Sequence, residues 1–460
     1  MTQCPMSPPP PKPAPRPDKV SLLRYLRLFR RDILSAQPQR LYRAWMAEFR
    51  TPFFRSYMCN QPELVDLVLK QRPDDFPKSE RISEGLRPLL GNSVFLTNGE
   101  VWKRQRRIID PAFEGGRLRD TFPAMWQAGQ AAVARMQGLA TGEAVEVEAH
   151  TSHAAADVIF RTLFSIPIEH QVATEVFDQF REHQRTQPVL NLGAFVPLPR
   201  WFPRFHRRRT KQTAQVIRQL ITQLTTERML AIRAGDAPDD LATKIMTTAD
   251  PETGVRFDTE EMVDQVAIFF LAGHETSASA LAWALYLLAL YPDWQDRVAE
   301  EAAVLASPVQ PEFSVVKKLQ VSRDVFRETL RLYPPVPMMV RENTCPEQLR
   351  DRTAPAGSQI VLSPWHLHRH ERLWERPDEF DPTRFETENG KSCLRDAYMP
   401  FSAGQRVCTG AGFAMVEGPL ILSQLVRAYR FEVVTEKPPV PVAHLTVRGG
   451  DGIWLRFTPR

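Results

Sequence analysis

The chain has 460 residues, of which 43% are hydrophobic and 25% charged, and its formal net charge is +5. This balance is typical of a soluble globular protein and excludes a disordered chain, a coiled coil and a polytopic membrane protein. Residues 1–43 carry nine basic and two acidic side chains, so the rest of the chain is nearly neutral and gives no electrostatic case for nucleic acid binding. Five cysteines without a CxxC pair exclude a disulfide framework and favour a reducing compartment.

The first element in chain order is a Pro-rich and basic N-terminal segment, residues 1–43. Eight prolines among residues 1–18 predict an extended, solvated tail, and the lack of an apolar centre there excludes a signal peptide. Residues 20–34 predict an amphipathic helix, too short and too charged to span a bilayer, which either packs on the domain or lies on an anionic membrane surface. We therefore expect a cytoplasmic protein without transmembrane anchor or secretory signal, with peripheral membrane contact through residues 20–34 as an open alternative.

Residues 44–460 are predicted to form a single domain that is mainly α with a minor β part. Helical periodicity is longest at 117–138, 208–233 and 260–305. Strand-like pieces are short and lie at 51–58, 355–362 and 430–457. The most apolar stretch, 262–291, contains His274 and Glu275 near its middle. Because a charge there is costly in lipid, we expect a buried helix rather than a membrane span.

A helix is expected to begin near residue 100, where Thr97 and Glu100 predict a capping box. Trp102 and Arg106 follow four residues apart, which places both side chains on one helical face. A basic surface helix is the alternative interpretation, because Lys103, Arg104 and Arg107 lie in the same stretch.

The apolar helix carries a short motif that runs from Ala272 through Gly273, His274 and Glu275 to Thr276. The small residues Ala272 and Gly273 leave space for a flat ligand beside the helix. A threonine hydroxyl within a helix can bond to the carbonyl one turn back and loosen the backbone ladder. The alternative is a core helix with one satisfied acid, and His274 is expected only to fill space.

The strongest signal is the segment from Phe401 to Gly410, which fits the pattern FxxGxRxCxG. A thiolate that binds iron needs a lowered pKa and protection from water. Gly404 and Gly410 let backbone amides approach the sulfur of Cys408, Arg406 adds positive charge, and Phe401 covers the sulfur. A lone cysteine is usually an inert buried thiol, but these neighbours predict a metal ligand.

On this motif the chain resembles the cytochromes P-450, which are haem-thiolate monooxygenases. The resemblance extends over residues 44–460 and implies the cytochrome P-450 fold, with haem b sandwiched between a long central helix and the loop of Cys408, the ligand of its iron. It also implies that Thr276 passes a proton to the reacting oxygen and that Glu275 replenishes this proton. The remaining cofactor-binding residues that it implies are Trp102, Arg106, Arg341, Arg406, Phe401, Gly404, Ala272 and Gly273.

Glu328 and Arg331 fit the ExxR pattern of the same family, although this spacing alone is weak because it also suits ordinary helix-surface pairs. Arg384 is expected to join them in a buried charge network that is structural rather than catalytic. Thr383 stands where the family usually has an acid, which is a mild departure from the pattern.

The implied activity is an oxidoreductase that activates dioxygen and hydroxylates or epoxidises a lipophilic small molecule, for which a fatty acid, terpene or steroid is a weak expectation. Electrons are expected from a separate ferredoxin or flavoprotein reductase, because the chain has no flavin or iron–sulfur segment. A candidate docking face for this partner consists of Lys103, Arg104, Arg107, Lys391 and Arg395. The candidate substrate pocket consists of Val94, Phe95, Phe269, Ala272, Met338, Met339, Val340 and part of 187–205.

Two alternatives remain open. One is a peroxide-using or isomerising haem-thiolate enzyme, against which Glu275 and Thr276 argue because such an enzyme needs no proton relay for dioxygen. The other is a non-enzymatic haem sensor or carrier, which would show no turnover with any electron donor.

Overall fold

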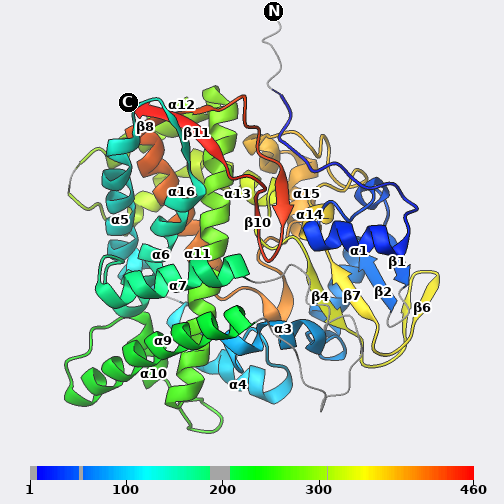
Figure 1. Cartoon of the computed structure of the whole chain (residues 1–460), viewed down its shortest axis with the longest axis horizontal. Helices are drawn as coiled ribbons and strands as arrows, with labels where there is room; N and C mark the ends of the chain where they lie inside the picture. The colour runs from blue at the N-terminus through cyan, green and yellow to red at the C-terminus, as the bar shows by residue number, and fades with distance from the viewer. Residues whose placement is uncertain (1–7, 51–54, 115, 187–207, 308) are drawn as a thin grey trace, which may run out of the picture.

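Helices dominate the computed structural model, which describes residues 8–50, 55–114, 116–186, 208–307 and 309–460. The longest is α11 (Thr259–Leu290), which runs through the middle of the molecule in Figure 1. The other helices are α1 (Leu22–Arg31), α2 (Pro62–Asp66), α3 (Glu80–Leu90), α4 (Gly99–Ile109), α5 (Arg117–Met136), α6 (Glu148–Phe164), α7 (Gln171–Thr186), α9 (Arg208–Ala234), α10 (Leu241–Thr247), α12 (Pro292–Glu301), α13 (Gln320–Leu332), α14 (Pro364–Leu367), α15 (Glu388–Asp396) and α16 (Ala411–Ala428). This mainly α fold with small sheets confirms the predicted fold class.

Four small sheets complete the fold. The largest has the order β1 (Met46–Arg50), β2 (Arg55–Cys59), β7 (Gln359–Leu362) and β4 (Met339–Glu342), and only the β2–β7 pair is parallel. A three-stranded antiparallel sheet joins β3 (Ala144–Glu146), β11 (Trp454–Pro459) and β8 (Tyr429–Val433). Two hairpins pair β5 (Glu347–Leu349) with β6 (Arg352–Ala354) and β9 (Pro441–Ala443) with β10 (Val447–Gly449). All three predicted strand regions therefore contain strands, although the first part of 51–58 lies outside the described residues.

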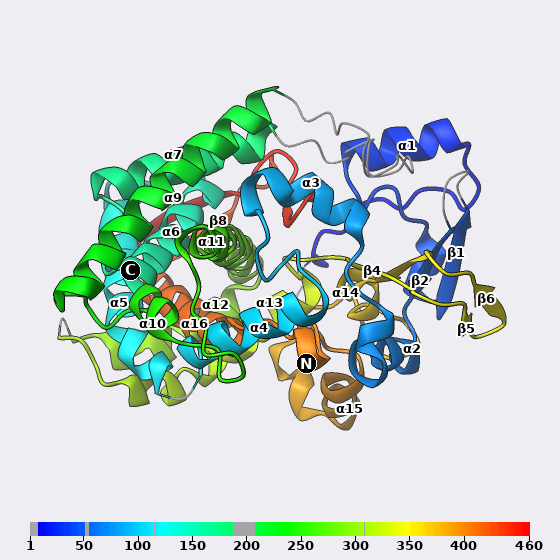
Figure 2. The same ribbon diagram turned by 90° about the horizontal axis from the view of Figure 1, so that it is seen from below.

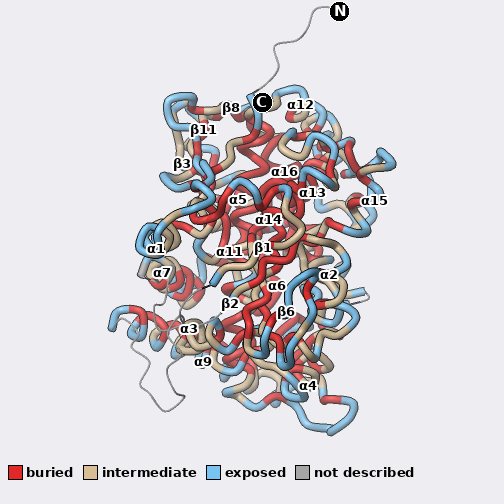
Figure 3. Tube along the Cα trace, turned by 90° about the vertical axis from the view of Figure 1, so that its right-hand side faces the viewer, coloured by how far each residue is buried: buried red, intermediate tan, exposed pale blue. Residues whose placement is uncertain are grey.

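Helix α11 is buried over most of its length, as the apolar stretch 262–291 predicts. Asp258 accepts from the backbone N–H of Glu261, whose side chain accepts in return from the N–H of Asp258, so a capping box fixes the start. Seen along its axis in Figure 2, α11 has helices α5, α6, α9 and α16 on one side and the β1–β2–β7–β4 sheet on the other. Figure 3 shows α11, α13 and α16 as mostly buried tube. In the described part of the chain no helix is long and apolar enough to cross a membrane.

The predicted helix 260–305 is in fact two helices, because α11 ends before Tyr291 and α12 begins at Pro292. Proline lacks the N–H that would continue the helical ladder but suits the first helical turn. The predicted helix near residue 100 is α4, yet its capping box is wrong. Asn98 precedes the helix, while the hydroxyl of Thr97 donates to the side-chain oxygen of Gln105 at 2.5 Å.

The N-terminal segment lies against the body of the protein, so the prediction of a solvated tail is wrong for residues 8–16. Pro10, Pro13 and Arg16 are buried and the residues between them are more accessible. This three-residue period is typical of polyproline II, in which every third side chain faces the same way.

Tyrosine hydroxyls and one ion pair hold this segment in place. Tyr333 donates to the carbonyl of Pro11 at 2.9 Å, and Tyr291 donates to that of Pro8 at 3.2 Å. The ammonium of Lys12 lies 2.9 Å from the carboxylate of Asp378. Residues 8–12 are therefore attached to the C-terminal ends of α11 and α13.

Candidate active site

A large cavity, about 2440 Å³ in volume, is lined both by α11 and by residues of the segment 400–410. Typical small-molecule pockets measure roughly 300–1,000 Å³. The cavity therefore has room for a large cofactor and a substrate at the same time. The predicted pocket residues of the described chain line it, namely Val94, Phe95, Phe269, Ala272, Met338, Met339 and Val340. The predicted stretch 187–205 lies outside the described residues.

One face of α11 is open to this cavity. Phe269, Ala272, Gly273 and Thr276 are partly or fully exposed and line the cavity, while most residues around them are buried. Their spacing of three and four residues is that of one helical stripe. The hydroxyl of Thr276 donates to the carbonyl of Ala272 at 2.5 Å, the bond one turn back that the sequence predicts. The hydroxyl thus stands on the cavity wall with its donor already engaged.

Gly273 is small for a reason that differs from the expectation. A Cβ at this position would come within 2.4 Å of the side chain of Ile159 on α6. The missing side chain therefore lets α6 and α11 approach each other, while the space for a flat ligand is left by Ala272.

Glu275 and His274 have their side-chain hydrogen-bond partners on elements other than α11. One oxygen of Glu275 accepts from the hydroxyl of Thr446 at 2.8 Å and from the guanidinium of Arg448 at 2.9 Å. His274 is fully buried and its Nε2 lies 2.6 Å from the hydroxyl of Ser152. Burial lowers the pKa of His274 to about 3, so this ring is neutral. His274 does more than fill space, because it links α11 to α6 by a hydrogen bond.

The thiol of Cys408 opens into the cavity, although protein surrounds the residue on its other sides. This burial raises the pKa of the thiol, whereas the N–H of Gly410 and the charges of Arg106 and Lys78 lower it. A Cβ added at Gly410 would lie 3.9 Å from the sulfur, so the glycine borders the thiol as the motif predicts. Binding to a cation would offset the cost of burying the thiolate. The N–H of Gly410 and the charges of Arg106 and Lys78 would still favour the thiolate.

Two further motif residues shape the turn that carries Cys408. The carbonyl of Phe401 accepts from the N–H of Cys408 at 2.9 Å, and the Phe401 ring lines the cavity. Gly404 has a φ of +68°, and a Cβ there would lie 1.9 Å from the carbonyl oxygen of Leu69. Gly404 is therefore required by the backbone of this turn, and its close neighbour is Leu69 rather than the sulfur.

Cationic side chains gather on the wall next to Cys408. Arg406 donates to the carbonyl of Thr97 at 3.1 Å and to the side chain of Asn98 at 2.8 Å. Its guanidinium lies 4.1 Å from the ring centre of Trp102. Burial is the main cause that lowers the pKa of Arg406 to about 9, and the neighbouring positive charge of Arg341 adds to it.

The other two predicted arginines complete this wall. Arg341 is 5% exposed and donates only to the carbonyl of Val340, at 3.3 Å, within the described residues. Burial lowers its pKa to about 10. Arg106 donates to the carboxylate of Asp110 at 2.9 Å and to the carbonyl of Val407 at 2.8 Å. The structure thus brings Trp102, Arg106, Arg341 and Arg406 to one cavity, as the sequence predicts.

Lys78 belongs to the same cluster and was missed by the sequence analysis. Its ammonium donates to the carbonyl of Phe95 at 2.5 Å. Burial, followed by the charges of Arg341, Arg406 and Arg106, lowers its pKa well below the ordinary value. Lys78 lies in a short connection, where the sequence has no helical or strand periodicity. It reaches the site through an isolated antiparallel β-bridge with Arg341. Among the four cations, Arg106 alone is hydrogen-bonded to a carboxylate of the described chain, so the cluster has an unbalanced positive charge.

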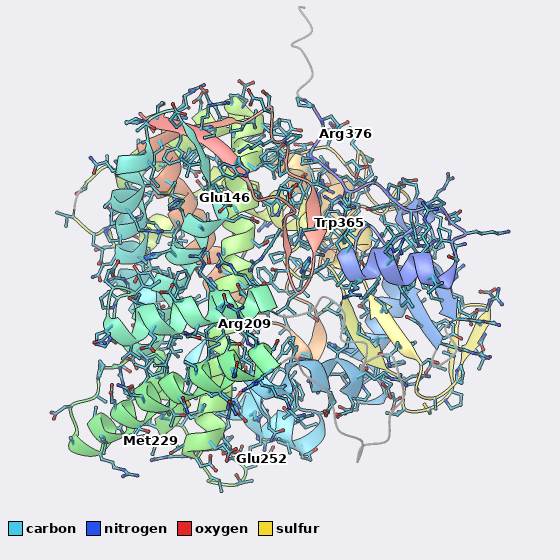
Figure 4. All side chains as sticks on the ribbon, viewed as in Figure 1. Glu146, Arg209, Met229, Glu252, Trp365 and Arg376 are labelled. Atoms are coloured by element: carbon cyan, nitrogen blue, oxygen red, sulfur yellow. The ribbon has the colours of Figure 1, made fainter. Side chains whose placement is uncertain are left out.

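A buried charge network forms behind this site, as predicted for Glu328, Arg331 and Arg384. Glu328 accepts from Arg331 through two bonds of 2.8 Å and from Arg384 at 3.1 Å. Arg384 also donates to the carbonyl of Arg376 at 3.0 Å. Arg376 is labelled near the top of Figure 4. All three predicted members are almost fully buried, so the network fixes α13 to the segment that precedes α15.

Glu417 is a second buried acid near α11. It lies on α16, lines the cavity and accepts from the hydroxyl of Ser277 at 3.4 Å. Burial raises its pKa to about 8. The sequence around Glu417 gives no local sign of this role, because the contact depends on how α16 and α11 meet.

The comparisons with known proteins agree with this arrangement. A family model described as Cytochrome P450 matches residues 33–450. The protein named cyclooctat-9-en-7-ol 5-monooxygenase, of Streptomyces melanosporofaciens, is 33% identical over 85% of this chain and 83% of its own length. Cyclooctatin synthase of the same organism is 30% identical, covering 85% of this chain and 84% of its own. Cytokinin hydroxylase of Arabidopsis thaliana is 28% identical, covering 87% and 78%.

Proposed function

Because the chain belongs to the cytochrome P450 family and is an oxidoreductase of the monooxygenase type, we propose that it hydroxylates or epoxidises a lipophilic small molecule. The observation that carries this proposal is the shared cavity, in which the open stripe of α11 with Thr276 and the thiol of Cys408 line one apolar space. The wall between them is mostly aliphatic and aromatic, and such a wall favours an apolar substrate.

The residues present fit a haem, which we propose to be haem b. The described chain has no group of three or more His, Cys, Asp or Glu side chains that could hold a metal ion, so Cys408 needs a cofactor that brings the other ligands itself. The unbalanced positive charge formed by Lys78, Arg106, Arg341 and Arg406 fits an anionic group such as the two haem propionates. We propose that these four residues and the indole N–H of Trp102 hold the propionates.

The bound haem would supply the iron at which dioxygen is split, using two electrons and two protons, so that one oxygen atom enters the substrate and the other leaves as water. The chain's own contribution is to hold the cofactor, exclude water and move protons. Thr276 would donate a proton into the cavity, and Glu275 would replenish it, work that is worth roughly a factor of 100 to 10,000 in such reactions. Phe401 would shield the sulfur of Cys408 from water.

We infer a medium-to-large lipophilic substrate from the cavity. Met338 and Met339 lie on its wall, and methionine side chains adapt to irregular apolar shapes. One relative is named as a monooxygenase of cyclooctat-9-en-7-ol, which supports an alcohol or hydrocarbon of that kind as a first group of compounds to test.

Electrons would come from a separate ferredoxin or flavoprotein reductase. The five basic residues predicted to dock this partner all have acidic partners: Lys103 with Glu100, Arg104 with Glu261, Arg107 with Asp250, Lys391 with Glu388 and Arg395 with Asp396. Their net positive potential is therefore weaker than the sequence implies, and docking on this face would rely on shape as well as charge.

We also propose a cytoplasmic location with peripheral membrane contact through residues 20–34. In α1 the side chains of Arg24, Arg27, Arg30 and Arg31 are exposed, and Leu23 is 81% exposed beside them. Basic and apolar side chains on one surface helix favour an anionic bilayer.

The test begins with the purified holoprotein. Candidate lipophilic compounds are screened for a change in the spin state of the iron, and those that bind are incubated with dioxygen and a surrogate ferredoxin and reductase. We expect an oxygenated product that incorporates label from ¹⁸O₂. Cys408→Ala should lose both product and the thiolate-type absorption of the reduced carbon monoxide complex.

The outcome also separates the alternatives. Product formed only with added peroxide, or rearranged product without label, would identify the peroxide-using or isomerising enzyme. Binding of haem and ligand without turnover by any donor would identify a sensor or carrier.

A further inference from the structure

The two oxygens of Glu275 have different surroundings. Oε1 accepts two hydrogen bonds, from Thr446 at 2.8 Å and from Arg448 at 2.9 Å. Oε2 is buried and has no hydrogen-bond partner among the described residues. A buried carboxylate oxygen without a partner is costly, so Oε2 can accept a hydrogen bond from a water at the cavity wall, which Glu275 lines.

Both donors to Glu275 come from one hairpin, formed by β9 and β10. The residues at its tip, His444 and Leu445, line the cavity together with Thr446. The hairpin is thus a part of the wall that a substrate touches and is also the structure that holds the acid. No other element supplies a hydrogen bond to the carboxylate of Glu275 in the described part of the chain.

The hairpin is itself fixed to the helices at several points. The carbonyl of Val447 accepts from the hydroxyl of Ser279 at 2.5 Å and from the indole of Trp283 at 3.3 Å. The N–H of Gly449 donates to the partly buried carboxylate of Glu148 on α6 at 3.0 Å. Because both ends of β10 are anchored, the positions of Thr446 and Arg448 are well defined relative to α11.

Arg448 also reaches α7, where its guanidinium donates to the side-chain oxygen of Gln184 at 3.2 Å. The amide nitrogen of Gln184 is buried without a partner among the described residues, and Gln184 lines the cavity. Two unpartnered polar atoms, Oε2 of Glu275 and Nε2 of Gln184, therefore flank the same guanidinium. Such a pair is a suitable place for an ordered water.

We propose that Arg448 and Thr446 are positioning residues for the proton supply. They hold Oε1 of Glu275 so that Oε2 remains free at the cavity wall. The position of this proton donor then depends on the β9–β10 hairpin, which also lines the substrate cavity. This inference rests on the proposed monooxygenase function, for which Glu275 replenishes the proton of Thr276.

The ion pair is more important for position than for stability. Arg448 is 40% exposed and Glu275 is 5% exposed, and a pair that is open to solvent on one side contributes little to the free energy of unfolding. A displacement of a reacting group by about 1 Å, in contrast, can reduce a rate by roughly 100-fold. Loss of Arg448 should therefore affect proton delivery while the fold remains intact.

The experiment compares Arg448→Gln and Thr446→Val with the conservative variants Arg448→Lys and Thr446→Ser. Arg456→Gln is the matched control, because Arg456 is 38% exposed, pairs with Glu436 on the same C-terminal part of the chain and does not line the cavity. With the substrate found by the spin-state screen, we expect the Gln and Val variants to divert electrons from product to hydrogen peroxide by about tenfold. Lys and Ser should restore most of the coupling, and the control should equal the unaltered protein.

A second readout does not require turnover. The infrared carboxylate bands of Glu275 are assigned by difference against Glu275→Gln. They should shift in Arg448→Gln and Thr446→Val and should stay in place in Arg456→Gln.

The inference is overturned if Arg448→Gln couples as the unaltered protein does while Glu275→Gln uncouples, or if the assigned bands do not shift. Failure of the proposed function is a different result, namely that the unaltered protein forms no oxygenated product with any donor. The infrared comparison still decides in that case whether Arg448 and Thr446 hold the carboxylate.

Discussion

Replacing Glu328 by glutamine tests the buried charge network with almost no change in volume. The carboxylate accepts four hydrogen bonds: two from Arg331 at 2.8 Å, one from Arg384 at 3.1 Å and one from the N–H of Asp381 at 3.0 Å. Glu328 and Arg331 are fully buried. The substitution leaves two buried guanidinium groups without their counter-charge and turns an amide NH₂ group toward donors.

The expected cost follows from the burial of these cations. Removing one partner from a buried ion pair destabilises a protein by about 3–5 kcal/mol. Arg331 cannot turn toward water, because its other donors already bond to the carbonyls of His368, Pro377 and Glu379. For a chain of 460 residues, an unfolding entropy of about 2.1 cal/mol/K per residue converts this loss into a melting temperature lower by roughly 3–5 °C.

Urea unfolding of the holoprotein, followed by tryptophan fluorescence, measures the effect on the free energy of unfolding. Glu388→Gln is the matched control, because Glu388 pairs with Lys391 at 2.8 Å but is 92% exposed, and no measurable change is expected there. A decrease in the free energy of unfolding below about 1 kcal/mol for Glu328→Gln would refute the reasoning. It would mean that other groups compensate the charges of the two buried arginines.

Three further predictions concern the cavity. Thr276→Ala should increase the share of electrons recovered as hydrogen peroxide by roughly tenfold, measured by peroxide assay during turnover, whereas Thr276→Ser should not. The double variant Trp102→Ala with Arg106→Ala should retain less haem on purification, measured as the ratio of haem to protein absorbance. Burial raises the pKa of Glu417 from 4.5 to about 8, so the folded protein binds a proton there that the unfolded chain releases. The free energy of unfolding should therefore fall by about 1.4 kcal/mol per pH unit from this group between pH 4.5 and 8, and Glu417→Gln should remove that slope in urea titrations.

Each of these has a contrary result. Unchanged coupling in Thr276→Ala removes its hydroxyl from the proton supply. Full haem occupancy in the double variant makes α4 an ordinary surface helix. A pH slope that survives in Glu417→Gln assigns the slope to another acid, and Glu148, whose pKa desolvation raises to about 7, is the first candidate.

The sequence reveals residues whose signal is local. The motif around Cys408, the helical stripe that contains Thr276, and the spacing of Trp102 and Arg106 depend on neighbours a few positions away, and the structure has each of them on one cavity. The family to which the chain belongs follows from the same local patterns. Helix ends were less predictable, as Asn98 shows: it precedes α4, but its side-chain oxygen accepts from the N–H of Lys78 and from Arg406 and does not cap the helix.

Contacts between distant segments could not be predicted. Arg448 reaches Glu275 across 173 positions of the sequence, and no periodicity connects a short C-terminal hairpin with the central helix. Lys78 joins the arginine cluster only through the path of the backbone. Gly273 is a further example. Its contact with Ile159 depends on how α6 and α11 cross, and the motif around the glycine does not reveal this crossing.

The docked N-terminal segment has a consequence for the order in which the protein is made. Lys12 and its partner Asp378 are separated by 366 positions, and ribosomes add about 5–20 residues per second. Asp378 is therefore synthesised roughly 20–70 s after Lys12, and the segment cannot form this contact earlier. The N-terminal segment can therefore dock only after most of the chain has been synthesised.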